Sequence, residues 1–220
     1  ALAAALLVAA LSPVALLLSG FQGGMDSVMI FFVLLSALLL QRMPTPLWGG
    51  LAFGMALNIK VWPLLLVPAI LAWLPDVRRR WLFAVTALVV VLAGSAPVLF
   101  EAPRLVLTRV FTYGGMTGGW GIPRWLGILG SLTGFEAPAA LYVAAGKYLT
   151  ILTLAAGGLW LQRKRPGASL AVRLGWLTAL FLVITPVFGL HYLAWLAPWG
   201  VLLGPEALLL FSYTTAIFLV

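Results

Sequence analysis

The chain is a succession of apolar runs separated by short polar connections. The runs cover residues 1–18, 28–40, 47–59, 61–74, 81–100, 139–161, 173–190, 192–203 and 207–220. Those at 81–100 and 139–161 are long enough to cross about 30 Å of hydrocarbon at about 1.5 Å per residue. None alternates apolar and polar residues as a membrane barrel strand does. The pattern predicts an all-α, polytopic membrane protein with about eight to nine hydrophobic helices, some of them broken or too short to span.

Composition supports this class and excludes others. Of the 220 residues, 64% are hydrophobic and 8% are charged. The net charge of +8 would suggest nucleic-acid binding in a water-soluble protein, but the basic loops of a membrane protein explain it with no nucleic-acid partner. Because the sequence contains no cysteine, disulfides, thiol catalysis and Cys-based metal sites are excluded within it.

Both ends of the sequence are apolar. It begins ALAAALLVAALSP, without a basic region ahead of the apolar run, and ends without a polar tail. We therefore expect residues 1–220 to form a single transmembrane helical domain that is a fragment of a longer protein, lacking an N-terminal helix and a first outer loop.

Basic residues collect in a few connections and predict how the chain crosses the membrane. Eight cations would lie on the cytoplasmic face: Arg42, Arg78, Arg79, Arg80, Arg163, Lys164, Arg165 and Arg173. Three would lie outside: Arg104, Arg109 and Arg124. This excess of basic residues inside is typical of membrane proteins. It requires that residues 47–74 enter the membrane and return to the same face, instead of crossing it as one kinked helix.

The stretch 50–68, GLAFGMALNIKVWPLLLVP, sets one cation, Lys60, into an apolar passage ahead of Pro63. A lysine at the centre of a spanning helix costs roughly 2.5–3.5 kcal/mol, whereas a helix break provides free carbonyls, water or an anionic ligand. Proline causes such a break because it has no N–H. We therefore expect two short helices hinged at residues 58–63, with a functional site beside Lys60. The alternative is a lysine that snorkels to the membrane surface.

In this topology the remaining unusual polar residues share the outer face. They are Asp26, Lys60, Arg104, Arg109, His191 and Tyr192. An acid, several cations and the only histidine are the groups that a site for an anionic, phosphate-bearing substrate needs. The alternative is that they are dispersed, since any polytopic protein places polar residues in its loops.

Several of these residues also have a structural interpretation. Asp26 is either a general base, or acceptor for a sugar hydroxyl, or a solvated cap of the helix that starts near residue 27. His191 is either part of the site or an interfacial residue. The tract 113–125, YGGMTGGWGIPRW, lacks a P-loop's Lys-Ser/Thr ending, so we expect a flexible outer loop with Trp120 and Trp125 as interfacial or sugar-stacking aromatics. Gly50 and Gly54 are explained by close helix packing.

Three short motifs resemble a known family. They are residues 20–27 (GFQGGMDS), 60–63 (KVWP) and 191–198 (HYLAWLAP). In this order they are similar to the Gly-rich polar loop, the Lys-aromatic-Pro hinge and the His- or Gln-aromatic-Leu-Trp-x-x-Pro element of GT-C type, polyprenyl-phosphate-sugar-dependent glycosyltransferases. The membrane mannosyltransferases are the most similar. One departure concerns the family's catalytic acid, which lies in the first outer loop, whereas Asp26 lies in what resembles a later one.

The resemblance implies a membrane enzyme that transfers a sugar, mannose above all, from a polyprenyl-phosphate donor to a lipid, glycan or protein acceptor. It implies a multi-pass protein of a cell membrane, such as a bacterial inner membrane, with an extracytoplasmic site. Asp26 is then the candidate catalytic base, and Lys60, Arg104, Arg109, His191 and Tyr192 are candidates for the donor phosphate. The candidate substrate-lining residues are Gln22, Asn58, Trp62, Trp120 and Trp195. No metal cluster or cofactor motif is evident, which favours a metal-independent reaction without a cofactor.

Two other classes stay open at this point. A lipid or solute transporter, such as a flippase, would also have broken helices and intramembrane charge, but it would show inverted hydropathy repeats, and none is visible here. A non-catalytic assembly subunit would need no convergent polar residues.

Overall fold

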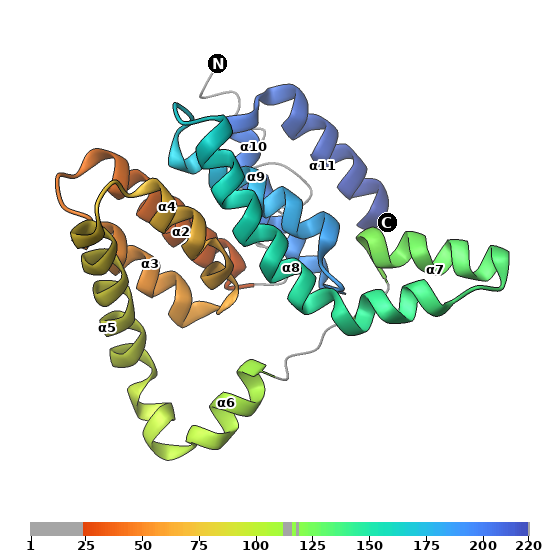
Figure 1. Ribbon diagram of the computed structural model, residues 1–220, viewed down its shortest axis with the longest axis horizontal. Helices are drawn as coiled ribbons and strands as arrows, with labels where there is room; N and C mark the ends of the chain where they lie inside the picture. The colour runs from red at the N-terminus through yellow and green to blue at the C-terminus, as the bar shows by residue number, and fades with distance from the viewer. Residues whose placement is uncertain (1–23, 112–115, 118, 220) are drawn as a thin grey trace.

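A computed structural model describes residues 24–111, 116–117 and 119–219, and nearly all of them are helical (Figure 1). The helices are α2 (Asp26–Arg42), α3 (Leu47–Ile59), η2 (Trp62–Leu66), α4 (Val67–Trp73), α5 (Val77–Glu101), α6 (Pro103–Phe111), α7 (Gly121–Thr133), α8 (Ala137–Lys164), α9 (Leu170–Ile184), η3 (Leu190–Tyr192), α10 (Leu193–Leu203) and α11 (Pro205–Leu219). Two short strands, β1 (Met116–Thr117) and β2 (Val187–Phe188), pair antiparallel. The prediction of an all-α architecture is confirmed.

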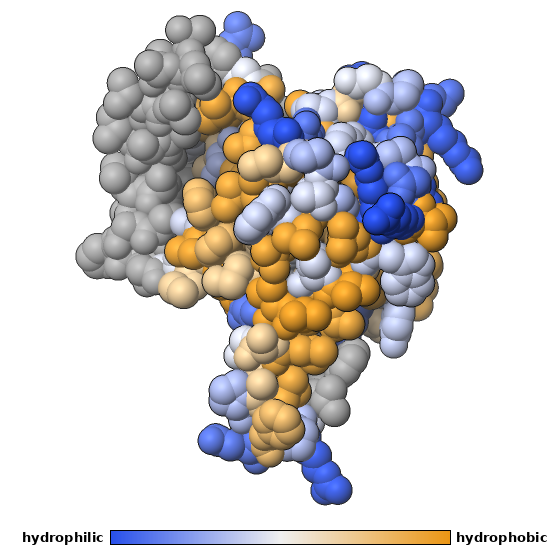
Figure 2. Space-filling model, turned by 90° about the vertical axis from the view of Figure 1, so that its left-hand side faces the viewer, coloured by the Kyte–Doolittle hydropathy of each residue, from blue (hydrophilic) through white to orange (hydrophobic). Residues whose placement is uncertain are grey.

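Two of the described helices, α5 and α8, are long and apolar enough to cross a membrane. Apolar side chains on α5 are largely exposed, among them Val85, Leu88 and Leu92. On the face that carries α5, apolar groups fill the space between hydrophilic groups at the top and at the bottom (Figure 2). An exposed apolar zone between two polar ends is what a helix facing lipid requires, so the molecule is a membrane protein.

The helix break at Lys60 is confirmed. α3 ends at Ile59, Lys60 is extended at φ −152° and ψ 143°, and the chain resumes as the 3-10 helix η2 with Pro63 near its start. Because Pro63 has no N–H, the α3 helix cannot continue through it. Residues 47–74 are therefore two short helical segments, not one spanning helix.

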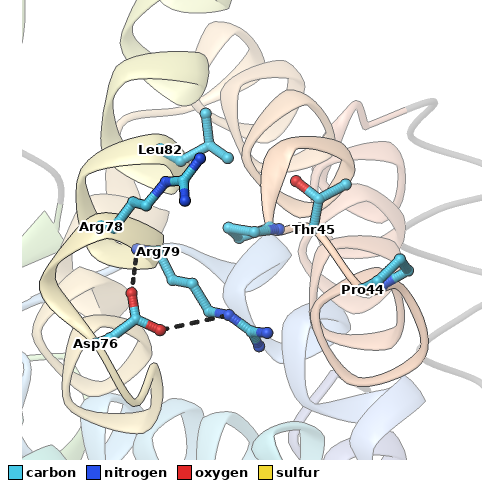
Figure 3. A pocket seen from close by; sticks show the side chains of 7 residues that line it. Pro44, Thr45, Asp76, Arg78, Arg79 and Leu82 are labelled. Carbon is cyan, nitrogen blue, oxygen red and sulfur yellow. Dashed lines mark hydrogen bonds and ion pairs between the residues drawn. The ribbon is translucent and has the colours of Figure 1, made fainter.

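The turn after α2, the start of α5 and the α8–α9 loop lie at one end of the molecule, which we call the basic end (Figure 1). Pro44, Thr45, Arg78 and Arg79 line one pocket there (Figure 3). In the α8–α9 loop, Arg173 donates to the carbonyls of residues 165, 166 and 168. All eight cations assigned to one face by the sequence are thus at this end.

The core lies between α2, α3, α9 and α10. Its largest fully buried side chains include Phe53, Trp195 and Trp199. Since Arg42 ends α2 at the basic end, Asp26 at the start of α2 lies about 24 Å away at 1.5 Å per residue. This opposite end, where α2 begins and η2 and η3 lie, is where Asp26, Lys60, His191 and Tyr192 meet.

Two local predictions were wrong, and two helices were missed. The helix expected over 173–190 ends at Ile184, because Pro186 follows and the chain then pairs as β2. The tract 113–125 is not wholly a loop, since β1 and the start of α7 lie within it. Helices α6 and α7 were not predicted at all, because their apolar residues are interrupted by Arg, Gly and Thr.

Candidate functional site

The carboxylate of Asp26 joins two segments that are far apart in the sequence. Its Oδ1 accepts a hydrogen bond from Lys60 Nζ at 2.6 Å and another from Trp195 Nε1 at 2.6 Å. The side chain is 11% exposed, and it does not cap α2, whose N-cap is Met25 without a side-chain hydrogen bond. The structure therefore excludes the solvated helix cap. Asp26 is the charged centre of a buried contact between α2, the break at Lys60, and α10.

Lys60 is compensated by this carboxylate and by aromatic rings. Its Nζ lies 5.2 Å from the ring centroid of Trp195 and 5.6 Å from that of Tyr192. Both distances are within the range of cation–π attraction. The side chain stays 30% exposed, so the ammonium is partly open. Because the helix ends at Ile59, the chain can direct this cation towards Asp26 instead of into lipid.

Aromatic rings from three elements, η2, η3 and α9, pack around Trp195 of α10. The ring centroid of Tyr192 is 4.1 Å from that of Trp195, Trp62 is 4.5 Å away and Phe181 is 5.7 Å away. Phe188 continues the packing from Tyr192 to Trp120, on which it stacks at 4.6 Å. We call these six residues the aromatic cluster. Phe181 and Phe188 were missed from the sequence, because a phenylalanine in an apolar run carries no signal that separates it from ordinary core.

His191 borders the aromatic cluster from η3. Its ring centroid is 4.7 Å from that of Tyr192 and 6.4 Å from that of Trp195. A Cβ at Gly189 would lie 2.5 Å from His191 Cε1, so the imidazole occupies space that only glycine leaves. His191 lies outside α5 and α8, and burial, together with the positive charge of Lys60, lowers its pKa, while Asp26 opposes the shift. The imidazole is therefore neutral near pH 7.

Three polar atoms here have no hydrogen-bond partner among the residues that the structure describes. Trp62 Nε1 and His191 Nε2 are buried and unpartnered. Asp26 makes both of its contacts through Oδ1, so its Oδ2 has no partner among the described residues and, unlike the other two atoms, is not fully buried. A buried polar atom without a partner costs about 1–3 kcal/mol, so such atoms are usually satisfied by a ligand or water. The Trp62 N–H as a donor, Asp26 Oδ2 as an acceptor and the His191 imidazole nitrogen together suit a ligand that carries hydroxyl and phosphate groups.

Other predicted site residues are not part of this centre. The Asn58 amide donates to the Val90 carbonyl on α5 at 2.9 Å and accepts from Ser95. Trp120 Nε1 donates to the Leu182 carbonyl, and its ring lies at the edge of the aromatic cluster. Arg104 is exposed on α6, with no ion pair to any described residue.

Two further predictions cannot be placed. Gln22 lies outside the described residues, and so does the side chain of Arg109, whose backbone belongs to α6. Within the described part of the chain, no group of three or more His, Asp or Glu side chains could hold a metal ion.

Comparison with known proteins now gives the chain a family. The model of glycosyltransferase family 87 matches residues 1–186, which include Asp26, Lys60 and Trp62. His191 and Trp195 lie just beyond the matched residues, yet they contact the same centre. The searches of curated proteins and of solved structures gave no match. The match extends over most of the 220 residues, and the chain therefore belongs to glycosyltransferase family 87.

Proposed function

We propose that this membrane glycosyltransferase is of the GT-C type and transfers mannose from a polyprenyl-phosphate donor to a hydroxyl of a lipid, glycan or protein acceptor. The proposed site is extracytoplasmic, at the end opposite the basic end, in a multi-pass protein of a bacterial inner membrane. The observation that carries the proposal is the contact of Asp26 with Lys60 and Trp195. Its orientation rests on the eight cations of the basic end, since cytoplasmic loops are enriched in Lys and Arg.

The reaction makes two demands on the protein. The oxygen of the acceptor hydroxyl attacks the anomeric carbon, and the bond from that carbon to the phosphate oxygen breaks, with its electron pair leaving on the lipid phosphate. The hydroxyl proton passes to a base. A cation must therefore stabilise the departing phosphate, and a carboxylate must accept a proton.

Lys60 suits the first demand. One of the three N–H groups of its ammonium donates to Asp26, which leaves two for phosphate oxygens, and the side chain is partly exposed. Asp26 is not the only group that stabilises the ammonium, because it also lies over the rings of Tyr192 and Trp195. Phosphate binding here would add a second anion to a cation that is already fixed in position.

Asp26 suits the second demand through Oδ2. Lys60 and Trp195 both hold Oδ1, so the carboxylate is oriented while its second oxygen is free to accept from a hydroxyl. Trp62 Nε1 and His191 Nε2 would hydrogen-bond the sugar or the phosphate. The rings of the aromatic cluster would pack against the sugar and the first isoprene units. Tyr192 contributes through its ring beside the ammonium.

The proposal is tested by mutating Lys60 in the full-length enzyme. Removing one preorganised charge that stabilises a leaving group costs about 10²–10³-fold in kcat. We expect Lys60→Ala to lose transfer from polyprenyl-phosphate mannose by about this factor. Lys60→Arg should restore only part of it, because the planar guanidinium fits a place occupied by an ammonium poorly.

A lysine at the basic end gives the matched control. Lys164→Ala removes the same charge from the last turn of α8 and should leave transfer unchanged. Initial rates in purified, reconstituted protein decide the question. Wild-type rates for Lys60→Ala would contradict the proposed role of Lys60 in phosphate stabilisation.

A further inference from the structure

A second polar site lies at the basic end, about the length of α2 away from Asp26. Pro44, Thr45 and Pro46, in the turn between α2 and α3, form one wall of a pocket of about 440 Å³. The other wall is the first turns of α5, with Asp76, Arg78, Arg79 and Leu82. Figure 3 shows the side chains of Arg78 and Arg79 reaching from α5 towards the turn that carries Thr45.

The charge of this pocket is positive. Arg79 Nε lies 3.4 Å from Asp76 Oδ2, an ion pair whose two members are about half exposed. Arg78 forms no ion pair with any described residue, so its guanidinium charge is uncompensated. Thr45 Oγ1 accepts from the Leu47 amide at 3.4 Å, which leaves the hydroxyl proton of Thr45 available to donate. Two guanidinium groups and a hydroxyl are a donor set for a phosphate.

The position of the pocket indicates where such a phosphate comes from. The pocket lies at the first turns of α5, a helix long and apolar enough to cross a membrane. Just beyond the arginines, Trp81 is 67% exposed and Val85 is 48% exposed. Tryptophan is enriched at the level of lipid headgroups, and Val85 lies one turn deeper on the same helix. Leu82, on the same helix, lines the pocket and gives it an apolar part.

We propose that this pocket binds the phosphate headgroup of an anionic glycerophospholipid in the leaflet at the basic end. Arg78 and Arg79 hold the phosphate oxygens, Thr45 donates a further hydrogen bond, and the glycerol and upper acyl chains lie against Leu82 and Trp81. The charge complementarity is with an anionic leaflet, which attracts arginines placed beside a membrane helix. The proposal does not depend on the sugar or on the catalytic role of Asp26.

The experiment measures binding of acyl-labelled phosphatidylglycerol to the purified full chain in neutral detergent micelles by fluorescence anisotropy. Unlabelled phosphatidylglycerol, phosphatidylcholine and inorganic phosphate are the competitors. The variant Arg78→Gln/Arg79→Gln removes both guanidinium groups from the pocket. Arg163→Gln/Lys164→Gln removes the same charge from the same end, outside the pocket. Size-exclusion profiles and thermal unfolding establish that each variant is folded.

We expect Arg78→Gln/Arg79→Gln to bind phosphatidylglycerol at least about tenfold more weakly, because each basic side chain near a lipid surface contributes about fivefold. Arg163→Gln/Lys164→Gln should stay within about twofold of wild type, and phosphatidylcholine should compete poorly. An equal loss of phosphatidylglycerol affinity in both double variants would overturn the proposal, because binding would then depend on net charge and not on this pocket. Competition by millimolar inorganic phosphate as strong as that by the lipid would overturn the lipid source.

The single variant Thr45→Val extends the test if the double variant does not fold. It keeps the shape and charge of the pocket and removes only the hydroxyl donor. We expect it to weaken phosphatidylglycerol binding by about twofold to tenfold, the range for the net contribution of one ordinary hydrogen bond. Unchanged affinity in Thr45→Val, together with wild-type affinity in Arg78→Lys, which lacks the planar fork, would also overturn the proposed contacts.

Discussion

Trp195 has two contacts at once in the candidate site. Its indole N–H donates to Asp26 Oδ1, and the ring lies under the ammonium of Lys60. Without Trp195, the only donor to the Asp26 carboxylate among the described residues would be the ammonium of Lys60, which is carried on a flexible stem. The indole is rigid and already packed between Tyr192 and Trp62. Trp195 therefore fixes the orientation of Asp26, and acts on any chemistry at Oδ2 as a positioning residue.

This role predicts a specific effect of Trp195→Phe. The substitution keeps an aromatic ring but removes the donor, so Asp26 can turn about its χ2 angle and Oδ2 loses its fixed direction. We expect kcat for sugar transfer to fall at least about tenfold with little change in KM, and stability to fall by about 1.5–3 kcal/mol. Steady-state kinetics and thermal unfolding in detergent measure the two effects.

Trp199→Phe is the matched control. Trp199 is also fully buried in α10, but its Nε1 has no hydrogen-bond partner among the described residues. This substitution removes similar ring volume without removing a described hydrogen bond, so kcat should stay near wild type. If the two variants lost kcat equally, Trp195 would be ordinary core packing.

His191 predicts a dependence on pH. Its pKa in the folded protein lies below the ordinary value of 6.5, because burial and Lys60 disfavour the imidazolium. The unfolded chain then binds the proton more readily than the folded protein as pH falls below 6.5. The contribution of His191 to stability is therefore fully present above pH 6.5 and is lost progressively at lower pH.

Comparison of wild type with His191→Gln isolates this contribution, since every other ionisable side chain is present in both proteins. We expect the Tm of wild type to fall relative to that of His191→Gln between pH 7 and pH 5. Donor binding should be flat between pH 7 and pH 8, where the imidazole stays neutral, and His191→Ala should bind donor about 1.5–3 kcal/mol more weakly. A Tm difference that does not vary with pH would show that His191 is accessible to water.

At the scale of single residues, the sequence indicates which residues are unusual, but it does not indicate which residues they contact. Lys60 is conspicuous because an isolated cation in an apolar run is expensive, and Pro63 indicates a break that makes room for it. The bond from Trp195 to Asp26 joins residues 169 positions apart, and no local pattern specifies it. Asn58 shows the opposite error, since a polar residue at a hinge suggested substrate contact, yet its amide joins α3 to α5.

At the scale of elements, close approach of α3 to α5 places the break at Lys60. Gly50 and Gly54 face α5, and a Cβ on Gly54 would lie 2.7 Å from the Ala87 carbonyl oxygen and 2.6 Å from Val90 Cβ. Asn58 sits one turn further along, where Gly94 leaves space for its amide. The three contacts form a continuous line along α3 towards Lys60. They confirm the small-residue packing predicted for Gly50 and Gly54.

This packing predicts that Gly54→Ala destabilises the protein. The added methyl would meet backbone and a β-branched side chain, neither of which can move freely, and overpacking of this kind costs about 1–3 kcal/mol. Because α3 ends one residue before Lys60, a shift of α3 should also lower sugar transfer. Thermal unfolding and transfer rates on the same preparations measure both effects.

Gly127→Ala in α7 is the control, because a Cβ there meets nothing within 4 Å. Replacing an open helical glycine by alanine should stabilise by up to about 1 kcal/mol. The two Gly→Ala changes thus have opposite expected signs. A stable, fully active Gly54→Ala protein would show that α3 and α5 can separate without affecting the site.

Prediction of elements worked where an apolar run is long and failed where it is mixed. α5 and α8 are evident from their runs of apolar residues, and α3 is bounded by Pro46 and the break at Lys60. α7 starts in a tract rich in glycine, which by itself indicates a loop. It forms because Trp120 anchors its start, with Nε1 on the Leu182 carbonyl and the ring on Phe188. Such tertiary anchors are invisible in local sequence.

At the scale of the whole molecule, the two ends differ in charge and in chemistry. The basic end holds eight cations and the lipid pocket proposed above, whereas the other end holds the Asp26–Lys60 pair and the aromatic cluster. The sequence predicts this separation, because Lys and Arg are enriched in the connections on one side of the membrane and scarce in those on the other. Membership of a glycosyltransferase family favours an enzyme over a transporter or a non-catalytic assembly subunit.

The last prediction concerns which end faces the cytoplasm, and cysteine labelling can decide it because the chain has no cysteine of its own. Ser131 in α7 precedes the spanning helix α8, and Gly167 follows it, so they lie on opposite sides of the membrane if α8 crosses. In intact cells an impermeant maleimide should label Ser131→Cys, while Gly167→Cys should react only after permeabilisation. The reverse pattern would place Asp26 and Lys60 on the cytoplasmic side and contradict the proposed extracytoplasmic transfer. Labelling of both variants in intact cells would mean that α8 does not cross.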